Sequence, residues 1–136
     1  MNKKELFTLA KEAMKNSYAP YSNYNVGAAL QTKNDKVYMG CNIENASYSA
    51  TCCAERTAIF SAVAKGEKEF KAICIVGGRN GDIMDYAMPC GVCRQVLAEF
   101  CGADFKIYVG INENKIKEFT LSELLPYSFN KSKLGE

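Results

Sequence analysis

The second half of this 136-residue chain alternates between helical and extended segments, and this alternation limits the folds open to it. Residues 53–65 and 90–101 have the pattern of helices that are each stopped by a glycine. A short apolar run follows each of them, at residues 72–76 and 106–110, as expected for buried strands. Strands that are separated by helices usually run parallel through crossover connections. We therefore expect an α/β domain.

The first half predicts one more helix and a hairpin. Apolar residues recur at helical spacing in residues 3–16, which predicts an amphipathic helix with a lysine-rich outer face. Two extended segments, residues 26–32 and 36–41, flank a polar turn of hairpin length at residues 33–35. These segments add a helix and two antiparallel strands to the domain.

The end of the chain completes the predicted sheet. Residues 111–120 have room for a final strand, and residues 121–125 have the pattern of a short helix. We find no internal repeat, linker or low-complexity segment, so residues 1–136 are predicted to form a single catalytic domain. The expected fold is a three-layer α/β/α sandwich around a mixed, mostly parallel five-stranded sheet.

Composition excludes several functional classes. The formal net charge is only +2, and Lys and Arg do not cluster with aromatic residues as they do in nucleic-acid-binding proteins, so we expect no nucleic-acid partner. No apolar run is long enough to span a bilayer, and the first residues lack the apolar stretch of a secretory signal. The sequence therefore predicts no association with a membrane.

Cysteine and histidine content limits the chemistry further. The chain has seven cysteines, an odd number that cannot all pair within it, so a reducing, cytoplasmic setting fits best. It has no histidine, which excludes histidine-dependent catalytic triads and the zinc sites that use histidine ligands. Any chemistry must rely on Cys, Glu, Asp, Lys or Tyr.

Two short motifs at predicted helix starts combine three potential zinc ligands. Cys90 and Cys93 are three residues apart in one helical turn, so both sulfurs lie on the same face, and Cys53 at the start of the other helix supplies a third. Helix N-termini favour thiolates because they carry partial positive charge. Three ligands leave a fourth position for a water molecule, which is typical of a catalytic zinc site.

The residues that follow Cys53 have chemistry that suits such a centre. Glu55 is two residues from a ligand and is better placed beside a zinc-activated water than on the metal, so we expect it to carry protons. Three thiolates on zinc leave a net charge of −1, which weakens the metal as a Lewis acid. Arg56 lies three residues after Cys53 and can donate hydrogen bonds to sulfur, which would offset this charge.

A structural zinc or thiol-redox module remains the alternative from another functional class, because a lone CxxC also occurs there. A fourth thiolate would have to close the site, and Cys52 is the nearest candidate. Adjacent helical residues point about 100° apart, which makes binding of one ion by both Cys52 and Cys53 awkward. The other cysteines fall in or near apolar segments and are expected to be buried and inert: Cys41, Cys74 and Cys101.

The motifs resemble those of the zinc-dependent cytidine deaminase family, in particular its short, homotetrameric branch with three cysteine ligands. Zinc deaminases carry a ligand-x-Glu followed by P-C-x-x-C, which corresponds here to Cys53-Ala54-Glu55 and residues 89–93. Further segments are similar to the family at matching places, and they are residues 18–22, 26–30, 40–46 and 90–95. The resemblance covers nearly the whole chain.

This resemblance implies roles for residues that the spacing alone does not single out. Asn42 and Glu44 would hold the ribose hydroxyls, because an amide and a carboxylate offer acceptors and a donor. Tyr24, where family members commonly have Phe, and Phe129 from a neighbouring subunit would stack on the base. The remaining residues implied to contact substrate are Ala54 and, from a neighbouring subunit, Ala46 and Tyr48.

The implied activity is the hydrolytic deamination of cytidine and deoxycytidine to uridine and deoxyuridine, with release of ammonia, in pyrimidine salvage. The implied assembly is a cytoplasmic homotetramer with one zinc per subunit and active sites completed by neighbouring subunits. A blasticidin-type aminonucleoside deaminase shares the two cysteine motifs, but the segment at residues 42–45 favours cytidine.

Overall fold

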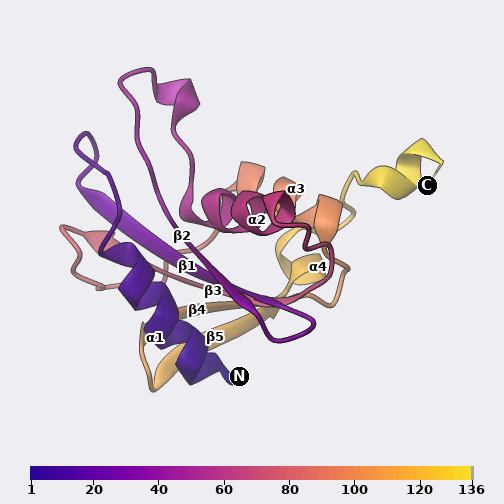
Figure 1. The fold of residues 1–136 in the computed structure, drawn as a ribbon, viewed down its shortest axis with the longest axis horizontal. Coiled ribbons are helices and arrows are strands. Elements are labelled where there is room, and N and C mark those ends of the chain that lie inside the picture. The colour runs from indigo at the N-terminus through magenta and orange to yellow at the C-terminus, as the bar shows by residue number, and fades with distance from the viewer. Residues whose placement is uncertain (136) are drawn as a thin grey trace.

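The structure, a computed structural model, describes residues 1–135. Four α-helices, five strands and two 3-10 helices follow one another along this part of the chain (Figure 1). Their bounds are α1 Lys3–Met14, β1 Tyr24–Thr32, β2 Val37–Cys41, η1 Tyr48–Ala50, α2 Ala54–Ala64, β3 Phe70–Arg79, α3 Gly91–Phe100, β4 Lys106–Asn112, β5 Lys115–Thr120, α4 Leu121–Leu124 and η2 Lys131–Leu134. All the predicted helices and strands are present, with ends that differ by a few residues.

The five strands form one mixed sheet in the order β2-β1-β3-β4-β5. Only β3 and β4 pair in parallel, whereas β1 pairs antiparallel with both β2 and β3, and β5 pairs antiparallel with β4. The prediction of a mostly parallel sheet is therefore wrong. The sheet has only one parallel pair because β1 lies between β2 and β3. The crossover through α2 therefore joins two strands, β2 and β3, that run in the same direction but are not neighbours.

Helices cover both faces of the sheet, as the three-layer prediction required. α1 packs on one face, where Leu6 and Ala10 contact Ala29 and other buried residues of the strands. α2 and α3 pack on the opposite face against Ala28 and Leu30 (Figure 1). Successive residues of β1 point to opposite faces, and this alternation gives each helix layer its own apolar surface.

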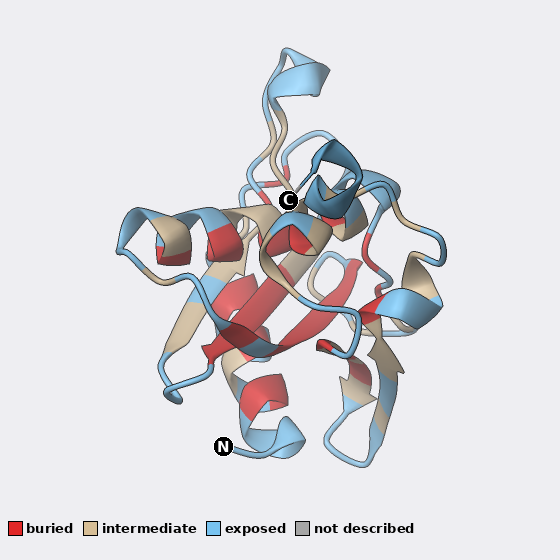
Figure 2. Ribbon diagram, turned by 90° about the vertical axis from the view of Figure 1, so that its right-hand side faces the viewer, coloured by how far each residue is buried: buried red, intermediate tan, exposed pale blue. Residues whose placement is uncertain are grey.

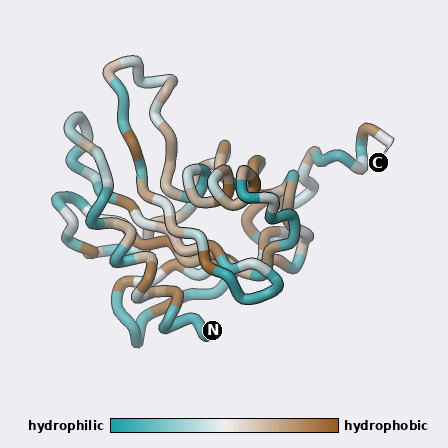
Figure 3. The backbone as a smooth tube through the Cα atoms, viewed as in Figure 1, coloured by the Kyte–Doolittle hydropathy of each residue, from teal (hydrophilic) through white to brown (hydrophobic). Residues whose placement is uncertain are grey.

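Burial is concentrated in the central strands and in the helix faces that cover them (Figure 2). Hydrophilic residues are most frequent in the connecting loops and at the chain ends (Figure 3). Within residues 1–135, no helix is both long and apolar enough to cross a membrane.

A glycine in β2 allows the site-bearing helix to lie close to the sheet. A Cβ atom on Gly40 would come within 2.5 Å of the Ala54 carbonyl oxygen and 2.5 Å of the Ala58 backbone nitrogen, both in α2. Only a residue without a side chain permits this approach. Gly40 thereby sets the start of α2 against the end of β2.

The segment between β2 and α2 projects from the body of the protein, with η1 near its tip (Figure 1). Backbone hydrogen bonds in both directions join Ile43 and Cys52 at its base, each 2.9 Å long. Ile43 also bridges to Tyr18, which precedes β1. These contacts fix residues 42–44 and residues 52–53 relative to the loop between α1 and β1.

Candidate metal centre and adjoining cavity

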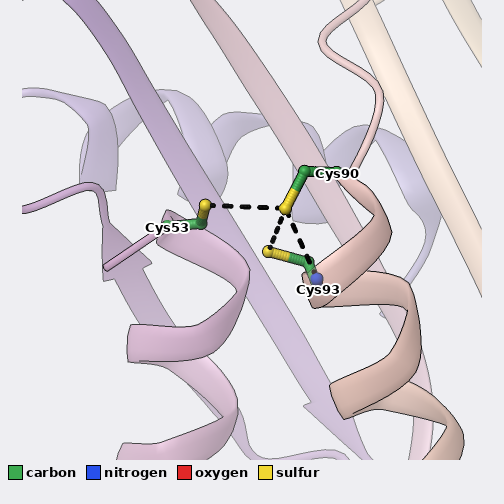
Figure 4. Close-up of side chains that lie close together, drawn as sticks. All are labelled: Cys53, Cys90 and Cys93. Atoms are coloured by element: carbon green, nitrogen blue, oxygen red, sulfur yellow. Dashed lines mark hydrogen bonds between the residues drawn. The ribbon is translucent and has the colours of Figure 1, made fainter. Parts of the chain in front are cut away.

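Three cysteines meet where α2 and α3 begin (Figure 4). Cys53 and Cys90 are the N-cap residues of these helices, and Cys93 lies in the first turn of α3. The Sγ atoms of Cys53 and Cys90 are 3.8 Å apart, those of Cys90 and Cys93 are 3.3 Å apart, and all three lie within 4.8 Å of one another. The structure thus brings together the three residues that the sequence spacing predicted.

The spacing of these sulfurs suits zinc. Tetrahedral zinc with Zn–S bonds of about 2.3 Å requires sulfurs about 3.8 Å apart, which the Cys53–Cys90 pair matches at 3.8 Å, while the Cys90–Cys93 pair is closer at 3.3 Å. Among residues 1–135, no further Cys, Asp or Glu belongs to this ligand group, so neither Cys52 nor Glu55 closes it. A three-sulfur donor set is the kind that leaves a fourth position to a water molecule or substrate, and it weighs against a closed structural site.

Hydrogen bonds within the cluster favour ionisation of Cys53. A hydrogen bond from the Cys93 thiol, together with the Arg56 guanidinium, lowers the pKa of Cys53 to about 5. The pKa of Cys93 is raised, because its proton is held by the Cys53 sulfur and because the side chain is buried. The Cys93 backbone N–H donates to the Cys90 Sγ over 3.4 Å, which uses one unpaired donor of the first turn of α3.

Glu55 is buried beside the cysteines. Its side chain is 4% exposed, in the first turn of α2. Burial raises the pKa of Glu55 to about 7, since a carboxylate loses hydration there. A carboxyl group that titrates near neutral pH can both accept and return a proton.

Arg56 contacts the cluster directly. Its Nη2 donates a hydrogen bond to the Cys53 Sγ over 3.2 Å, and this contact raises the pKa of the guanidinium further. The buried Nε of Arg56 makes no hydrogen bond to any other group in residues 1–135. The geometry agrees with a guanidinium that offsets thiolate charge, while its effect on a reaction rate stays a prediction.

A cavity of about 370 Å³ opens beside Cys53, Cys90 and Glu55. Its volume is in the range of small-molecule binding sites. Four other predicted site residues also line it, namely Tyr24, Asn42, Glu44 and Ala54. Seven lining residues were not singled out by the sequence, and they are Ser22, Val26, Thr51, Ile75, Tyr86, Ala87 and Met88.

Asn42 is tied into the start of β1. Its Oδ1 accepts hydrogen bonds from the Val26 backbone N–H, at 2.9 Å, and from the Ser17 hydroxyl, and its Nδ2 donates to the Tyr24 carbonyl over 2.7 Å. The side chain is buried. One Nδ2 proton is left for a ligand, because the other polar positions of the amide are in use.

Glu44 is held by the loop that precedes β1. Its Oε1 accepts from the Tyr21 and Ser22 backbone N–H groups over 2.9 and 3.1 Å, and its Oε2 accepts from the Ser22 hydroxyl. These contacts, the Ser22 hydroxyl above all, lower the pKa of Glu44. The carboxylate keeps one acceptor position on Oε2 for a ligand.

Three predicted substrate residues do not line the cavity of this chain: Ala46, Tyr48 and Phe129. Tyr48 lies on the projecting segment, is 75% exposed and packs edge-on against Tyr21, with ring centroids 6.0 Å apart. Phe129 lies beyond α4 and is 61% exposed, and its carbonyl accepts a hydrogen bond from Gln95 Nε2 over 2.7 Å. Their roles at a neighbouring subunit's site stay predictions.

The loop after β3 forms one wall of the cavity. The sequence alone did not indicate a role for this loop. Tyr86, Ala87 and Met88 all contribute to this wall. The Nζ of Lys117 in β5 lies 4.5 Å from the centre of the Tyr86 ring, a cation–π contact that helps to hold the loop. Their position directly before Pro89 was the one available signal, since residues next to a ligand motif usually lie near the metal.

The other cysteines lie outside the metal centre. Cys74 is fully buried in β3, and burial raises its pKa to about 12, as expected for an inert core thiol. Cys101 and Cys41 are only partly buried, although burial raises the pKa of both, that of Cys101 to about 12. A larger cavity, about 660 Å³, has Cys101 on its wall but contains none of the predicted site residues.

Comparison with known proteins agrees with this geometry. The family model described as "Cytidine and deoxycytidylate deaminase zinc-binding region" matches residues 1–110. The chain is 44% identical to a cytidine deaminase of Sporosarcina psychrophila, over 99% of this chain and 96% of that protein. It is 45% identical to a cytidine deaminase of Halalkalibacterium halodurans over the full length of both.

Solved structures give the same result for the fold. A crystal structure of cytidine deaminase from Burkholderia pseudomallei matches with a TM-score of 0.86 and 43% identity, covering 95% of this chain and 100% of that one. A family-model match over most of the chain and full-length identities above 40% agree with the motifs around Cys53 and Cys90. The chain therefore belongs to the cytidine deaminase family.

Proposed function

We propose that this protein is a zinc-dependent enzyme that deaminates cytidine and deoxycytidine to uridine and deoxyuridine, with release of ammonia. The observation that carries the proposal is the shared cavity. Two cysteines of the cluster, Cys53 and Cys90, line it together with the buried Glu55, and Asn42 and Glu44 add polar groups that suit a sugar. Its family membership supports the same reaction class.

Cys53, Cys90 and Cys93 would hold one zinc ion per chain. When bound, zinc lowers the pKa of a coordinated water toward neutrality and so supplies the nucleophile for hydrolysis. Arg56 would keep the sulfur-rich centre from becoming too electron-rich, through its hydrogen bond to the Cys53 Sγ.

Glu55 would move the protons of the reaction. Its carboxylate would take a proton from the attacking water and deliver it to the ring nitrogen next to the carbon that bears the amine. It would then take the proton of the newly added hydroxyl and deliver it to the departing amine, which leaves as ammonia. In the metal-free protein burial raises the pKa of Glu55 to about 7, so this carboxyl group can hold a proton as well as release it near neutral pH. Removing the carboxyl would slow this chemistry without removing a metal ligand.

The sugar-side end of the cavity, formed by Tyr24, Asn42 and Glu44, would position the nucleoside. Asn42 has one free N–H and Glu44 has one free acceptor position, so together they can accept and donate to a sugar hydroxyl. The ring of Tyr24 would pack against the pyrimidine. Ala54, at the start of α2, would contact the base from the metal-centre side.

A homotetramer would complete these sites. Tyr48 and Phe129 are large apolar side chains that are exposed in a single chain, which supports contacts with neighbouring subunits. In the assembly Phe129 would stack on the base, and Ala46 and Tyr48 would approach a neighbour's substrate. The same reaction in a cytoplasmic setting would serve pyrimidine salvage. Sedimentation equilibrium would test the assembly, with a fourfold mass expected.

The direct test is to measure ammonia release and the accompanying ultraviolet change with purified, zinc-loaded protein. Cytidine and deoxycytidine should both be consumed, with one ammonia released per nucleoside. Cytosine and blasticidin S serve as comparison substrates, and a preference for blasticidin S would favour the aminonucleoside deaminase. Full zinc occupancy without turnover of any of these compounds would favour a structural zinc module and contradict the proposal.

A further inference from the structure

Ser22 is the hub of a polar network at the sugar-side end of the cavity. Its backbone N–H donates to Glu44 Oε1 over 3.1 Å, and its hydroxyl donates to Glu44 Oε2. Both oxygens of one carboxylate are therefore bound by a single residue that lies 22 positions earlier in the chain. Ser22, Glu44 and Tyr24 all line the cavity.

The orientation of the Ser22 hydroxyl is fixed by its second partner. Its Oγ accepts a hydrogen bond from the Tyr24 backbone N–H over 3.0 Å. A hydroxyl has only one proton to donate, and with the Tyr24 N–H directed at its oxygen, this proton is directed to Glu44. The same hydroxyl thus links Glu44 to the start of β1.

Arg79 fastens this arrangement to the sheet. The Arg79 Nη1 donates to the Ser22 carbonyl over 3.2 Å, and Arg79 pairs with Tyr24 in the register of β1 and β3. The loop between α1 and β1 is therefore tied to the end of a central strand. This contact adds to the backbone hydrogen bonds that hold the loop, among them those from the Asn80 N–H to the Asn23 carbonyl at 2.6 Å and from the Glu44 N–H to the Tyr18 carbonyl at 2.8 Å.

We propose that Ser22 is a positioning residue that holds the Glu44 carboxylate in the orientation needed to bind the sugar of the substrate. This inference rests on the proposed function. Formation of the turn would require only the hydrogen bond from the Tyr24 N–H to the Ser22 Oγ. The Ser22 hydroxyl also donates to the Glu44 carboxylate, which lines the cavity and keeps one acceptor position free. The lowered pKa of Glu44 is consistent with this contact.

The test is the steady-state kinetics of cytidine deamination by the zinc-loaded Ser22→Ala variant. A hydrogen bond to a charged group is worth enough that its loss should raise KM about 10-fold, with kcat within about twofold of wild type. Ser22→Thr keeps the hydroxyl and should restore most of the affinity. Ser61→Ala removes the hydroxyl of an exposed residue on α2 that, within residues 1–135, bonds only to the Ala58 carbonyl, and it should leave both constants unchanged.

A double-mutant cycle separates positioning from a general structural role. If Ser22 acts through Glu44, Ser22→Ala should have no further effect on KM in a Glu44→Ala background. Equal, additive effects in both backgrounds would overturn the inference, as would an unchanged KM in Ser22→Ala. Thermal unfolding of each variant would show whether the fold is intact.

Arg79→Gln provides a second route should Ser22→Ala fail to fold. It removes the guanidinium contact with the Ser22 carbonyl and leaves the hydroxyl in place, so KM should rise by a smaller factor, about 3-fold, again with kcat preserved. A wild-type KM in Arg79→Gln alongside a misfolded Ser22→Ala would overturn the inference. Active wild-type enzyme with unaffected variants would contradict this inference alone, whereas inactivity of the wild type on every nucleoside would contradict the proposed function as well.

Discussion

The cysteines and Glu55 occupy the first turns of two α-helices, whereas Asn42 and Glu44 lie on the loop that follows β2. Groups of the first kind are placed by the regular backbone geometry of the helix starts, and Cys93 and Glu55 are also buried. Groups of the second kind are placed by side-chain hydrogen bonds to another loop, between α1 and β1. One cavity therefore has a metal-centre end built on helix starts and a sugar-side end that depends on polar contacts between loops. Substitutions at the metal-centre end should therefore change zinc binding or kcat, whereas substitutions at the sugar-side end should change KM.

Cys90→Ala should have the largest effect. It removes a proposed zinc ligand, and it also removes the sulfur that accepts the Cys93 backbone N–H at the start of α3. We expect loss of bound zinc and of activity, measured by metal analysis of the purified protein. Cys52→Ala is the matched control, because Cys52 lies beside a proposed ligand but outside the ligand group, and it should keep its zinc. A full complement of zinc in Cys90→Ala would show that the cluster is not the metal site.

Glu55→Gln should stabilise the metal-free protein at high pH. Folding raises the pKa of Glu55 from 4.5 to about 7, so ionisation of this carboxyl group lowers the free energy of unfolding. The associated stability is present below pH 4.5 and is lost as pH rises to about 7, a difference of roughly 3 kcal/mol. Gln resembles the protonated carboxyl, so the variant should unfold at higher denaturant concentration at pH 8.

This gain from Glu55→Gln should shrink as the pH falls toward 4.5. Chemical denaturation of the wild type and the variant at pH 8 and pH 5 measures the change. Glu99→Gln, at an exposed position on α3, is the control and should change little at either pH. A constant difference between wild type and Glu55→Gln across this range would show that Glu55 is not held in a desolvated site.

Arg56→Gln tests the charge balance at the metal-centre end. The variant loses the hydrogen bond from Nη2 to the Cys53 Sγ but no metal ligand. Zinc should remain bound, while kcat for cytidine falls about 10- to 100-fold, the usual range for a group that supports a metal ligand. Metal analysis and steady-state kinetics measure the two properties on the same sample. A rate within twofold of wild type would remove the proposed role of Arg56.

Asn42→Asp should have the smallest effect on the chemistry and should act at the sugar-side end. It sets a carboxylate oxygen against the Tyr24 carbonyl in place of the Nδ2 donor, within a buried site. The free energy of unfolding should fall by about 1 to 3 kcal/mol and KM should rise, while zinc content stays unchanged. Denaturation and kinetics measure these changes. Loss of zinc, or a lower kcat at unchanged KM, would contradict the division of the cavity into two ends.

The order and type of the helices and strands could be predicted from the sequence, because hydrophobic periodicity and glycine stops are local signals. The neighbour order of the strands could not. Crossovers through α2 and α3 predicted strands of the same direction, and β2, β3 and β4 do run the same way. The placement of β1 between β2 and β3 depends on tertiary packing, and no local sequence pattern predicts it.

The two ends of the cavity also differ in how far they could be predicted from the sequence. Cys90 and Cys93 lie within one helical turn, so their convergence follows from helix geometry. The Cys-x-Glu motif indicated Glu55 as a site residue, but side chains two apart on a helix do not face each other, so its place in the cavity is seen only in the folded chain. Asn42 and Glu44 bind hydroxyl groups of Ser17 and Ser22, which lie more than twenty residues away, and only the folded chain brings them together. The walls formed by Tyr86 and Met88 depend in the same way on the path of a loop.

Zinc-assisted deamination with Glu55 as the proton carrier is tested by parallel measurement of zinc content and of ammonia release from cytidine, in wild type and in Glu55→Gln. We expect equal zinc in the two proteins, steady ammonia release by the wild type, and a kcat lower by about 100- to 10,000-fold in the variant. Equal zinc with comparable ammonia release in both proteins, or no release by the zinc-loaded wild type, would contradict it.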